Sequence, residues 1–355
     1  MASTATTAYT RARDRITRIC QGTADARVLR LELLAVIGRA VGFDACAWLL
    51  TDPETSVGSS PLADVPCLPV LPQLIRLKYL TAINRWTSLP CGAMSLSGAV
   101  GGDLSRSLMW RELLHSYQVT DIASSVYRDR FGCWGFLDLW RIQAPPFCDA
   151  DTKFLSGIAG TVTAALRRSQ ARTFAPSAGT DTLPAGPVVL LLSPDLQVRA
   201  KTPQAQRYLR VLVPPDAEDQ APVPASGYNV AAQLLATEAG ADANPPLARV
   251  HMAHDRWLTL RAARLDGPQP PSERDIAVSI EPATPHDRVV VFARACGLSP
   301  RETQLLHHLV TGADTRELAR HLFVSENTVQ DHLKSIFAKT ATRTRRTLLA
   351  RALGI

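Results

Sequence analysis

The sequence lacks the long apolar runs of a secreted or membrane-spanning protein. Its longest run of branched aliphatic residues in 355 residues is Val188–Leu192, whereas a transmembrane helix needs about 20 apolar residues. The N-terminal stretch has no apolar core of the secretory type and is rich in Ala, Thr and Arg,. We therefore expect no membrane partner, and we interpret residues 1–19 as an N-terminal tail.

Cysteine pairs and common catalytic motifs are also missing. The seven cysteines are odd in number and no two form a C-x-x-C pair, so neither a disulfide framework nor a zinc site is expected, and a cytoplasmic location fits better. The sequence has no G-x-x-x-x-G-K-[ST], G-x-G-x-x-G, H-E-x-x-H or G-x-S-x-G motif,. We expect no enzymatic activity, no metal site and no cofactor.

Lysine is scarce, and the positive charge is unevenly distributed. Five Lys stand against thirty-four Arg, and the net charge is +7. Residues 298–355 hold nine Lys or Arg against five acidic residues, a net charge of +4 in about one sixth of the chain. A localised basic segment makes nucleic acid a candidate partner.

Composition and periodicity predict an α+β protein with more than one domain. Proline-rich stretches at 174–186 and 281–287 read as linkers,. The predicted division is a tail at 1–19, a first sheet domain at 20–173, a linker at 174–186, a second sheet domain at 187–283, and an all-α domain of four helices at 290–355,.

The first sheet domain mixes helices and strands. The expected elements are helices at 27–41, 103–117 and 150–169, the last capped by Asp149, and strands at 44–50 and 131–141,. In the strand at 131–141, the two-residue period puts Trp134, Phe136, Asp138 and Trp140 on one face and Cys133, Leu137 and Leu139 on the other,. Because both faces are largely apolar, we expect this strand to be central.

The Trp134-Gly135 pair, Arg141 and the long helix that follows resemble a GAF domain, a six-stranded antiparallel sheet between helices. Many GAF domains hold a small ligand against the sheet, so the resemblance implies a ligand pocket. Its candidate lining is Trp48, Trp86, Trp110, Trp134, Phe136, Asp138 and Trp140. The alternative is an ordinary aromatic core in which Asp138 pairs with a nearby arginine, and we favour it.

The second sheet domain is similar to a PAS-like fold in the order of its elements. We expect strands at 187–192 and 197–200, helices at 204–212 and 228–238, and a three-stranded meander at 249–253, 257–265 and 275–281,. His251 and His254 would point to opposite sides of a strand, so they do not suggest a metal site,.

The last block is a series of short amphipathic helices with clear start signals. Ser299 to Glu302 is a capping box with Pro at the first helical position,. That helix stops at Gly312, Asp314 or Thr315 caps the next helix with Glu317 in position to complete a box, and Ser325 caps a third,. A fourth helix is expected at 345–353.

The third helix has an apolar and a polar face. Val329, Leu333, Ile336 and Phe337 follow helical spacing, and Asn327, Gln330, Asp331 and Lys334 lie opposite,. Two short helices joined by a tight turn, the second with a polar outer face in a basic setting, describe a helix-turn-helix. The alternative is a small helical bundle with a solvated face.

The series resembles the DNA-binding domain of LuxR/NarL-type transcription regulators. The matching residues are Leu298, Ser299, Pro300, Arg301, Glu302, Leu305, Gly312, Glu317, Leu318, Ala319, Leu322, Val324, Ser325, Thr328, Val329, His332, Ile336, Lys339, Arg343 and Arg345. At 340–342 the sequence has Thr-Ala-Thr where the family usually has Leu-Gly-Val. This departure bears on the turn before the fourth helix.

The resemblance implies the role of each site residue. Bases would be read by Gln330, Asp331 and Lys334, and the DNA backbone would be contacted by Thr315, Ser325, Thr328, Lys339, Arg343 and Arg345,. Asp331 either accepts from a cytosine amine or pairs with Lys334. A homodimer would form through Leu348, Leu349 and their neighbours, of which one leucine must pack inward,.

Together these features predict a cytoplasmic transcriptional regulator. It would bind double-stranded DNA and respond to an unknown small-molecule ligand or protein partner at its sheet domains. The alternative is a protein-interaction scaffold or small-ligand sensor that does not read DNA sequence directly. Steep salt dependence of DNA affinity would distinguish the two.

Overall fold

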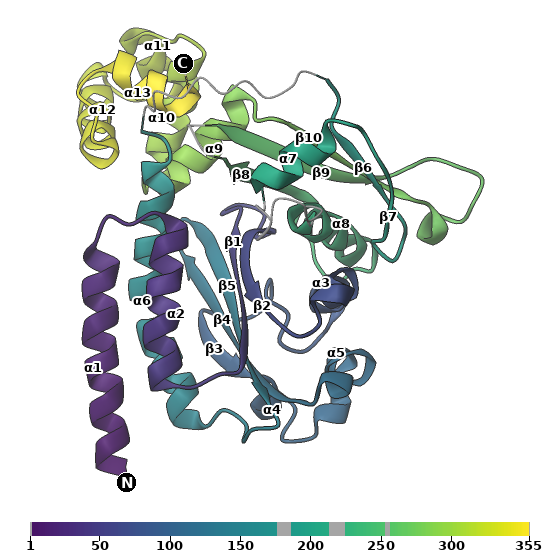
Figure 1. The fold of residues 1–355 in the computed structure, drawn as a ribbon. Helices are drawn as coiled ribbons and strands as arrows, with labels where there is room; N and C mark the ends of the chain where they lie inside the picture. The colour runs from purple at the N-terminus through teal and green to yellow at the C-terminus, as the bar shows by residue number, and fades with distance from the viewer. Residues whose placement is uncertain (1, 176–185, 213–223, 253–255, 355) are drawn as a thin grey trace.

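The structure is a computed structural model that describes residues 2–175, 186–212, 224–252 and 256–354. Two antiparallel sheets and a C-terminal group of helices make up the chain (Figure 1). The α+β class predicted from the sequence is therefore confirmed. No helix in the described part of the chain combines the length and apolarity needed to cross a bilayer.

The first sheet has five strands in the order β2-β1-β5-β4-β3. The strands are β1 (Ala45–Thr51), β2 (Gly58–Asp64), β3 (Gly92–Ser95), β4 (Val119–Asp129) and β5 (Gly132–Ile142). Strand β5 pairs with β1 on one side and β4 on the other, so the predicted central strand is confirmed. The GAF resemblance implied six strands, and the described residues form five.

Three long helices lie along one face of the first sheet: α1 (Ala2–Gln21), α2 (Ala26–Ala40) and α6 (Asp149–Arg172) (Figure 1). The expected tail is therefore wrong. Ala12, Ile16 and Cys20 recur every fourth residue and are buried against α2 and α6, which holds α1 in place,. Helix α6 begins at the expected point, although its N-cap is Cys148 rather than Asp149.

Shorter helices cover the opposite face. These are α3 (Leu71–Leu80), α4 (Leu96–Ala99) and α5 (Leu108–Glu112). The single helix expected at 103–117 is wrong, because Ser107 and Leu113 leave helical geometry and divide the segment. Ser107 instead caps α5 by accepting a hydrogen bond from the Trp110 backbone N–H,.

The second sheet also has five strands, in the order β7-β6-β10-β9-β8. The elements are β6 (Val189–Leu192), β7 (Val198–Lys201), α7 (Ala205–Leu212), α8 (Ala225–Glu238), β8 (Leu247–His251), β9 (Trp257–Arg264) and β10 (Ile276–Pro282). Strands β8, β9 and β10 are consecutive antiparallel neighbours, so the predicted three-stranded meander is confirmed.

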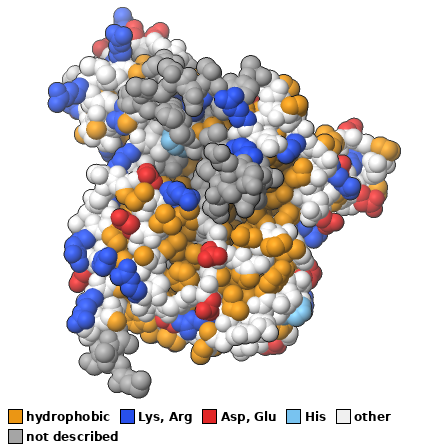
Figure 2. Space-filling model, in the orientation of Figure 1, with side chains coloured by type: hydrophobic (Ala, Val, Ile, Leu, Met, Phe, Trp, Pro, Cys, Tyr) orange, Lys and Arg blue, Asp and Glu red, His pale blue; other side chains and the backbone are white. Residues whose placement is uncertain are grey.

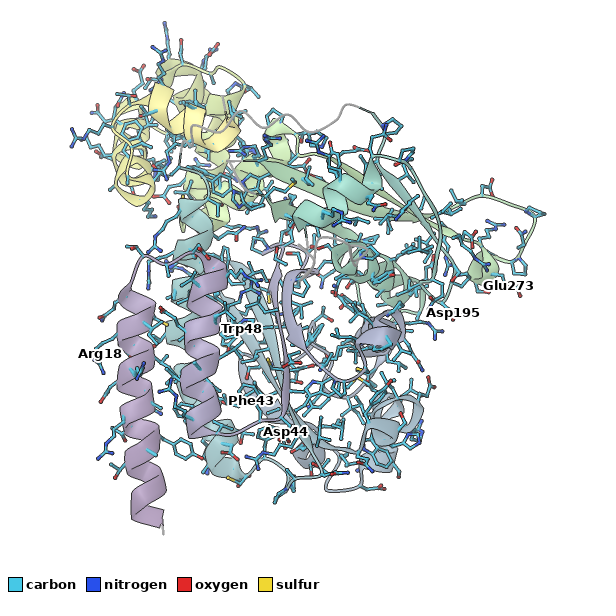
Figure 3. The ribbon with its side chains drawn as sticks, viewed as in Figure 1. Arg18, Phe43, Asp44, Trp48, Asp195 and Glu273 are labelled. Atoms are coloured by element: carbon cyan, nitrogen blue, oxygen red, sulfur yellow. The ribbon has the colours of Figure 1, made fainter. Side chains whose placement is uncertain are left out.

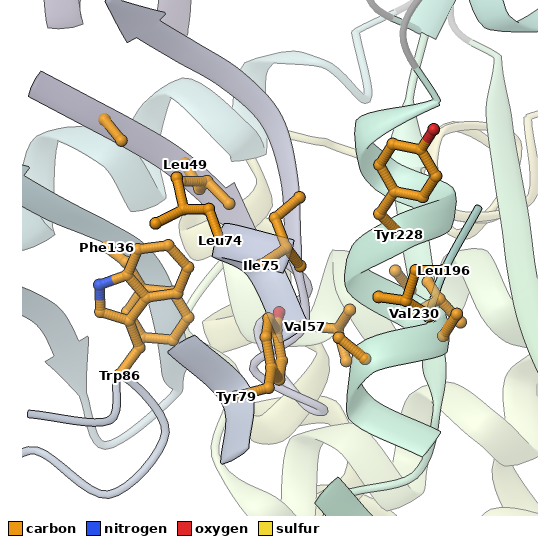
Figure 4. Packing of buried hydrophobic residues seen from close by; sticks show 14 of the residues in the cluster. Leu49, Val57, Leu74, Ile75, Tyr79, Trp86, Phe136, Leu196, Tyr228 and Val230 are labelled. Atoms are coloured by element: carbon orange, nitrogen blue, oxygen red, sulfur yellow. The ribbon is translucent and has the colours of Figure 1, made fainter. Parts of the chain in front are cut away.

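The two sheet blocks share one hydrophobic core. Helix α8 packs against α3 and β2 of the first block, and Tyr228 and Val230 on α8 belong to the same buried cluster as Tyr79 and Phe136 (Figure 4). An ion pair also joins the blocks, since Arg249 Nε lies 2.7 Å from Asp52 Oδ2 with both side chains buried. The blocks therefore pack as one body rather than as beads on a flexible linker.

The C-terminal helices follow without a linker. They are α9 (Pro285–Ala295), α10 (Pro300–Val310), α11 (Thr315–His321), α12 (Glu326–Thr340) and α13 (Arg345–Leu353). The linker expected at 281–287 is wrong, because Thr284 and Asp287 form a capping box that starts α9 directly after β10,. Of the other expected linker, residues 176–185 lie outside the described residues.

A β-bulge in β5 changes which aromatic side chains share a face. Tyr127 pairs with Gly135 and Arg128 with Cys133, so Trp134 is an extra residue in the ladder with β4,. The bulge reverses the side-chain alternation. Trp134 therefore packs with Leu137 and Leu139 on the side covered by α2 and α6, while Cys133 packs with Phe136 and Trp140 on the side covered by α3. The prediction that Trp134 shares a face with Phe136 is wrong.

The seven residues considered for a ligand pocket consequently do not line one space. Trp48, which lies beside α2 (Figure 3), and Trp134 belong to the core on the side of α2 and α6. Trp86, Phe136 and Trp140 belong to the core on the side of α3. Trp110 is partly buried, and its indole N–H donates to the Val119 carbonyl oxygen at 3.0 Å. A pocket lined by the whole set is therefore not formed.

Asp138 already has partners within the chain. Lys78 Nζ lies 2.9 Å from Asp138 Oδ2, and Trp86 Nε1 donates to Asp138 Oδ1 at 2.9 Å. Both members of the ion pair are buried. The ordinary-core interpretation is correct in its main point, but the partner is a lysine from α3 rather than the expected arginine.

Candidate nucleic-acid interface

Side-chain caps set the boundaries of α10 to α13. Ser299 and Glu302 form the predicted capping box of α10, and Asp314 and Glu317 form that of α11. Ser325 caps α12 by accepting from the Thr328 backbone N–H at 3.1 Å. Helix α13 spans the predicted 345–353 and is capped by Thr344. The sequence prediction of four helices is confirmed.

The inner faces of these helices form a common core. Leu305, Leu318, Val329, Leu333 and Ile336 are each at most 2% exposed. Helix α12 packs across both α10 and α11, and the small Ala319 on α11 is buried beneath it. The apolar stripe thereby turns the opposite face of α12 toward solvent.

Two tight turns frame α12. Phe323 takes a left-handed backbone with φ of 51° and is 95% exposed, which places its ring in solvent between α11 and α12. At the other end, Ala341 takes φ of 50° and closes α12. Thr340 and Thr342 are buried and their hydroxyls are 2.9 Å apart. The Thr-Ala-Thr departure is therefore accommodated by a left-handed residue and a threonine pair.

The predicted base-reading residues share one open face. Gln330, Asp331 and Lys334 are all exposed on α12, which lies at the edge of the molecule (Figure 1). Asp331 and Lys334 form an i,i+3 ion pair at 3.2 Å, with side chains 74% and 77% exposed. This pair is one of the two roles considered for Asp331. At such exposure it is worth little, so both groups remain available to a partner.

The predicted backbone contacts fall into two groups. Ser325 and Arg343 are exposed and Thr328 is partly exposed. By contrast, Arg345 Nη2 donates to Thr315 Oγ1 at 2.6 Å, which ties the start of α13 to the start of α11. Lys339 is tied to Glu302. These three residues hold the domain together and have less freedom to reach a phosphate.

Glu302 is the polar centre of the domain. Its side chain is 4% exposed and lies 2.6 Å from Lys339 Nζ, and it accepts at 2.6 Å from both Ser335 Oγ and the Ser299 backbone N–H. Burial alone would raise the pKa of Glu302, but hydrogen bonds from Lys339, Ser335 and Ser299 outweigh it and lower the pKa to about 2,. Glu302 therefore stays ionised and fixes α12 on α10.

Sequence reasoning missed two basic residues beside α12. Arg316 and Arg320 are exposed on α11 and, with Phe323 and Ser325, line a shallow groove next to the start of α12. Their i,i+4 spacing on a helix that precedes the turn was the available signal. Basic side chains are also visible around the C-terminal helices in the space-filling view (Figure 2).

The two leucines predicted for a dimer contact have different surroundings. Leu348 is fully buried, and Leu349 is partly buried. Leu348 is thus the leucine that packs inward, and it cannot contact a second copy. Helix α13 also packs against α9 of the same chain.

Several contacts join the C-terminal helices to the rest of the chain. Phe174, which is fully buried, stacks on Trp257 with ring centroids 4.9 Å apart and meets Phe292 of α9 edge-on at 5.2 Å. Arg351 of α13 donates to the Phe174 carbonyl oxygen at 3.3 Å. On α9, Arg294 donates to the Phe131 carbonyl oxygen and to Glu54. Helix α9 therefore packs against α6 of the first sheet block, β8 of the second sheet block, and α10 and α13 of the C-terminal helices.

Comparison with known proteins bears directly on this region. The family model for bacterial regulatory proteins of the luxR family matches residues 297–352. These residues carry a LuxR-family helix-turn-helix domain. The match covers α10 to α13, including both helices of the helix-turn-helix and the turn at Phe323.

Two curated relatives are similar to a short part of the chain. They are the probable csgAB operon transcriptional regulatory protein of Salmonella typhimurium (strain LT2) and the CsgBAC operon transcriptional regulatory protein of Escherichia coli (strain K12). Each is 48% identical over 48 residues, which is 14% of this chain and 22% of the relative. The chain spans about a fifth of the length of the curated relatives it matches.

Proposed function

We propose that this chain is a transcriptional regulator that binds double-stranded DNA through α12. The observation that carries the proposal is the open polar face of α12 in the full chain, where Gln330, Asp331 and Lys334 are exposed. The LuxR-family match of residues 297–352 and the names of the two regulatory relatives support it. The width of the major groove suits a single helix with such a face.

In this proposal, the exposed side chains contact DNA and the side chains that are hydrogen-bonded within the domain hold its helices in place. Gln330, Asp331 and Lys334 read base edges, with Gln suited to adenine and Lys to guanine. Ser325, Thr328 and Arg343 contact phosphates, and Arg316 and Arg320 join them because they are exposed on the same side of the turn. Thr315, Lys339 and Arg345 act mainly by holding the helices in place, since each is hydrogen-bonded within the domain.

We also propose a cytoplasmic homodimer whose sheet blocks, GAF-like at 20–173 and PAS-like at 187–283, sense a ligand or protein partner. Leu349 is the member of the leucine pair that retains some exposure. Asp138 is neutralised by Lys78, so a ligand would bind elsewhere than on the aromatic face of β5.

Selection of DNA from a random pool by the full-length chain tests the proposal. We expect a recovered consensus, and an affinity for it that falls steeply as salt rises because bound counterions are released. A scaffold or sensor without sequence readout would yield no consensus. A preference relaxed at one position of the consensus in Lys334→Ala, with the consensus unchanged in Lys153→Ala on the exposed surface of α6, would assign base readout to α12,.

A further inference from the structure

A cavity of about 430 Å³ lies where the two sheet blocks meet, away from the aromatic face of β5. Its walls come from four places: the start of α2, the strands β1 and β2, the last turns of α6, and strand β8 of the second block. The volume is within the range of small-molecule sites, which run from about 300 to 1,000 Å³.

The lining of this cavity carries excess positive charge. Four arginines line it, Arg27, Arg30, Arg172 and Arg249, against the single carboxylate of Asp25. Arg249 is neutralised by its ion pair with Asp52. Asp25 accepts hydrogen bonds from the backbone N–H groups of Arg27 and Val28 as the N-cap of α2. The charges of the other three arginines exceed what Asp25 can offset.

Arg30 is the most constrained of these cations. It is 3% exposed, and it has no carboxylate within ion-pair distance among the described residues. Its guanidinium is held by carbonyl oxygens, those of Ala26 at 3.0 Å, Trp48 at 2.9 Å and Ser60 at 2.8 Å. The Asp25 carboxylate acts on Arg30 only from beyond ion-pair distance, and a buried cation without a direct ion-pair partner is costly to maintain.

The charge on Arg30 persists at neutral pH. Burial and the nearby Arg27 lower the pKa of Arg30 to about 9, although the charge of Asp25 opposes them. A counter-anion in the cavity would therefore meet a guanidinium that is already oriented by three carbonyl groups. Arg27 and Arg172 are exposed, so the basic lining reaches the surface and can attract an anion from solution.

The remaining lining suits an organic body rather than a bare ion. Leu50 and Val250 supply apolar surface, and Ser59 and Ser60 lie beside them. His251 Nε2 is buried and has no hydrogen-bond partner among the residues that the structure describes. Burial and Arg288 lower the pKa of His251 to about 4, so the ring is neutral near pH 7 and one of its nitrogens can donate an N–H,.

We propose that this cavity binds a small organic anion, whose phosphate or carboxylate group is held by Arg30 with Arg27 and Arg172. Because its walls come from both sheet blocks, a bound anion would bridge them. The regulatory meaning of such binding rests on the proposed function, whereas the binding itself does not. The ligand would then be the signal that the sheet blocks sense.

Isothermal titration calorimetry with the full-length chain tests the site. Inorganic phosphate and citrate serve as separate probes, titrated at constant ionic strength in a chloride buffer. We expect saturable binding of at least one probe with a millimolar or tighter dissociation constant, and the stronger probe tells whether the site prefers phosphate or carboxylate. Neither probe giving saturable heat would overturn the proposal.

Variants assign the binding to the cavity. We expect Arg172→Gln to weaken binding about tenfold, in line with the loss of one charge-assisted hydrogen bond, and Arg30→Gln to abolish it. Arg39→Gln on the exposed side of α2 should bind as the wild type does. If Arg30→Gln does not fold, the double variant Arg27→Gln/Arg172→Gln tests the site instead, and unchanged anion binding in that variant would refute the proposal. Equal weakening by Arg39→Gln would mean surface attraction and refute the site. No DNA is present, so this outcome is independent of promoter binding.

Discussion

Lys339 Nζ lies 2.6 Å from Glu302 Oε2, and this contact ties α12 to the first helix of its domain. The Glu302 side chain is 4% exposed and the Lys339 side chain is 36% exposed. An ion pair in this position fixes the orientation of α12 relative to α10. The Glu302–Lys339 pair thus links the stability of the domain to the orientation of the exposed polar face of α12.

The first prediction concerns pH. The pKa of Glu302 is lowered from 4.5 to about 2 in the folded chain, so its contribution to stability is fully present above pH 4.5 and is lost as the pH falls toward 2. We expect amide hydrogen exchange in α10 and α12, corrected for intrinsic rates, to accelerate over that interval. Glu302→Gln should destabilise the domain by about 2 kcal/mol at pH 7 and remove the acid dependence.

Glu326→Gln is the matched control for that prediction, because Glu326 is exposed at the start of α12. Its effect should stay below about 1 kcal/mol. If both variants retained the same acid dependence, the Glu302 network would not be its source.

The second prediction concerns base reading. Lys334→Ala should reduce affinity for the selected DNA by about 1–3 kcal/mol and relax the preference at one base pair. Gln330→Ala should do the same at a neighbouring position. Competition binding with single-base variants of the consensus measures both effects. A uniform loss across all sequences would reassign Lys334 to a phosphate contact.

The third prediction concerns the turn after α12. Ala341 has φ of 50°, a conformation that glycine adopts at lower cost than alanine,. We therefore expect Ala341→Gly to stabilise the domain by about 0.5–1 kcal/mol. Ala338→Gly, at an exposed position inside α12, should destabilise it by about 1 kcal/mol,. Both effects are measured by unfolding in urea, monitored by amide hydrogen exchange in α12. Destabilisation by Ala341→Gly would contradict the left-handed turn.

The fourth prediction concerns the buried pair in the first sheet block. Lys78→Met would leave Asp138 buried without a counter-charge, so we expect a loss of about 3–5 kcal/mol in the free energy of unfolding,. The double variant Lys78→Met/Asp138→Leu should recover much of this loss. Asp266→Asn breaks an ion pair whose acidic member is fully exposed, and should cost less than about 1 kcal/mol,. Equal effects of Lys78→Met and Asp266→Asn would refute the role of burial.

The fifth prediction concerns assembly. Leu349→Asp should reduce cooperative binding to two half-sites by about tenfold while leaving binding to one half-site unchanged, because only the contact between copies is altered. Leu31→Asp, which changes a leucine that is 48% exposed on α2, is the control. Gel-shift titrations with one and two half-sites distinguish the outcomes, and unchanged cooperativity in Leu349→Asp would exclude α13 as the contact.

Local sequence rules predicted the C-terminal helices well. Their caps, such as Ser299 with Glu302 and Ser325 with Thr328, lie within four residues of one another, so each boundary is determined locally,. The same rule was available for α9, where Thr284 and Asp287 form a capping box, but the flanking prolines at 282 and 285 suggested a linker instead. Proline at the first helical position is compatible with a helix start.

The remaining differences arise from long-range contacts. The bulge at Trp134 depends on the register between β4 and β5, which no pattern within β5 alone reveals. Lys78 and Asp138 are sixty positions apart, and the identity of the partner follows only from how α3 crosses the sheet. Of the candidate site, the open face of α12 followed from sequence, whereas the internal roles of Lys339 and Arg345 required the packed domain.

The position of α13 against α9 has a consequence for how promoter occupancy would respond to protein concentration. With Leu348 buried and α13 packed against α9 of its own chain, only Leu349 of the leucine pair is left for the proposed contact between copies. We therefore expect the proposed homodimer to form mainly on DNA, with the free protein largely monomeric at low concentration. Adjacent half-sites would then act as the template on which copies pair. Occupancy would rise sigmoidally with concentration, making the response threshold-like even before any effector acts.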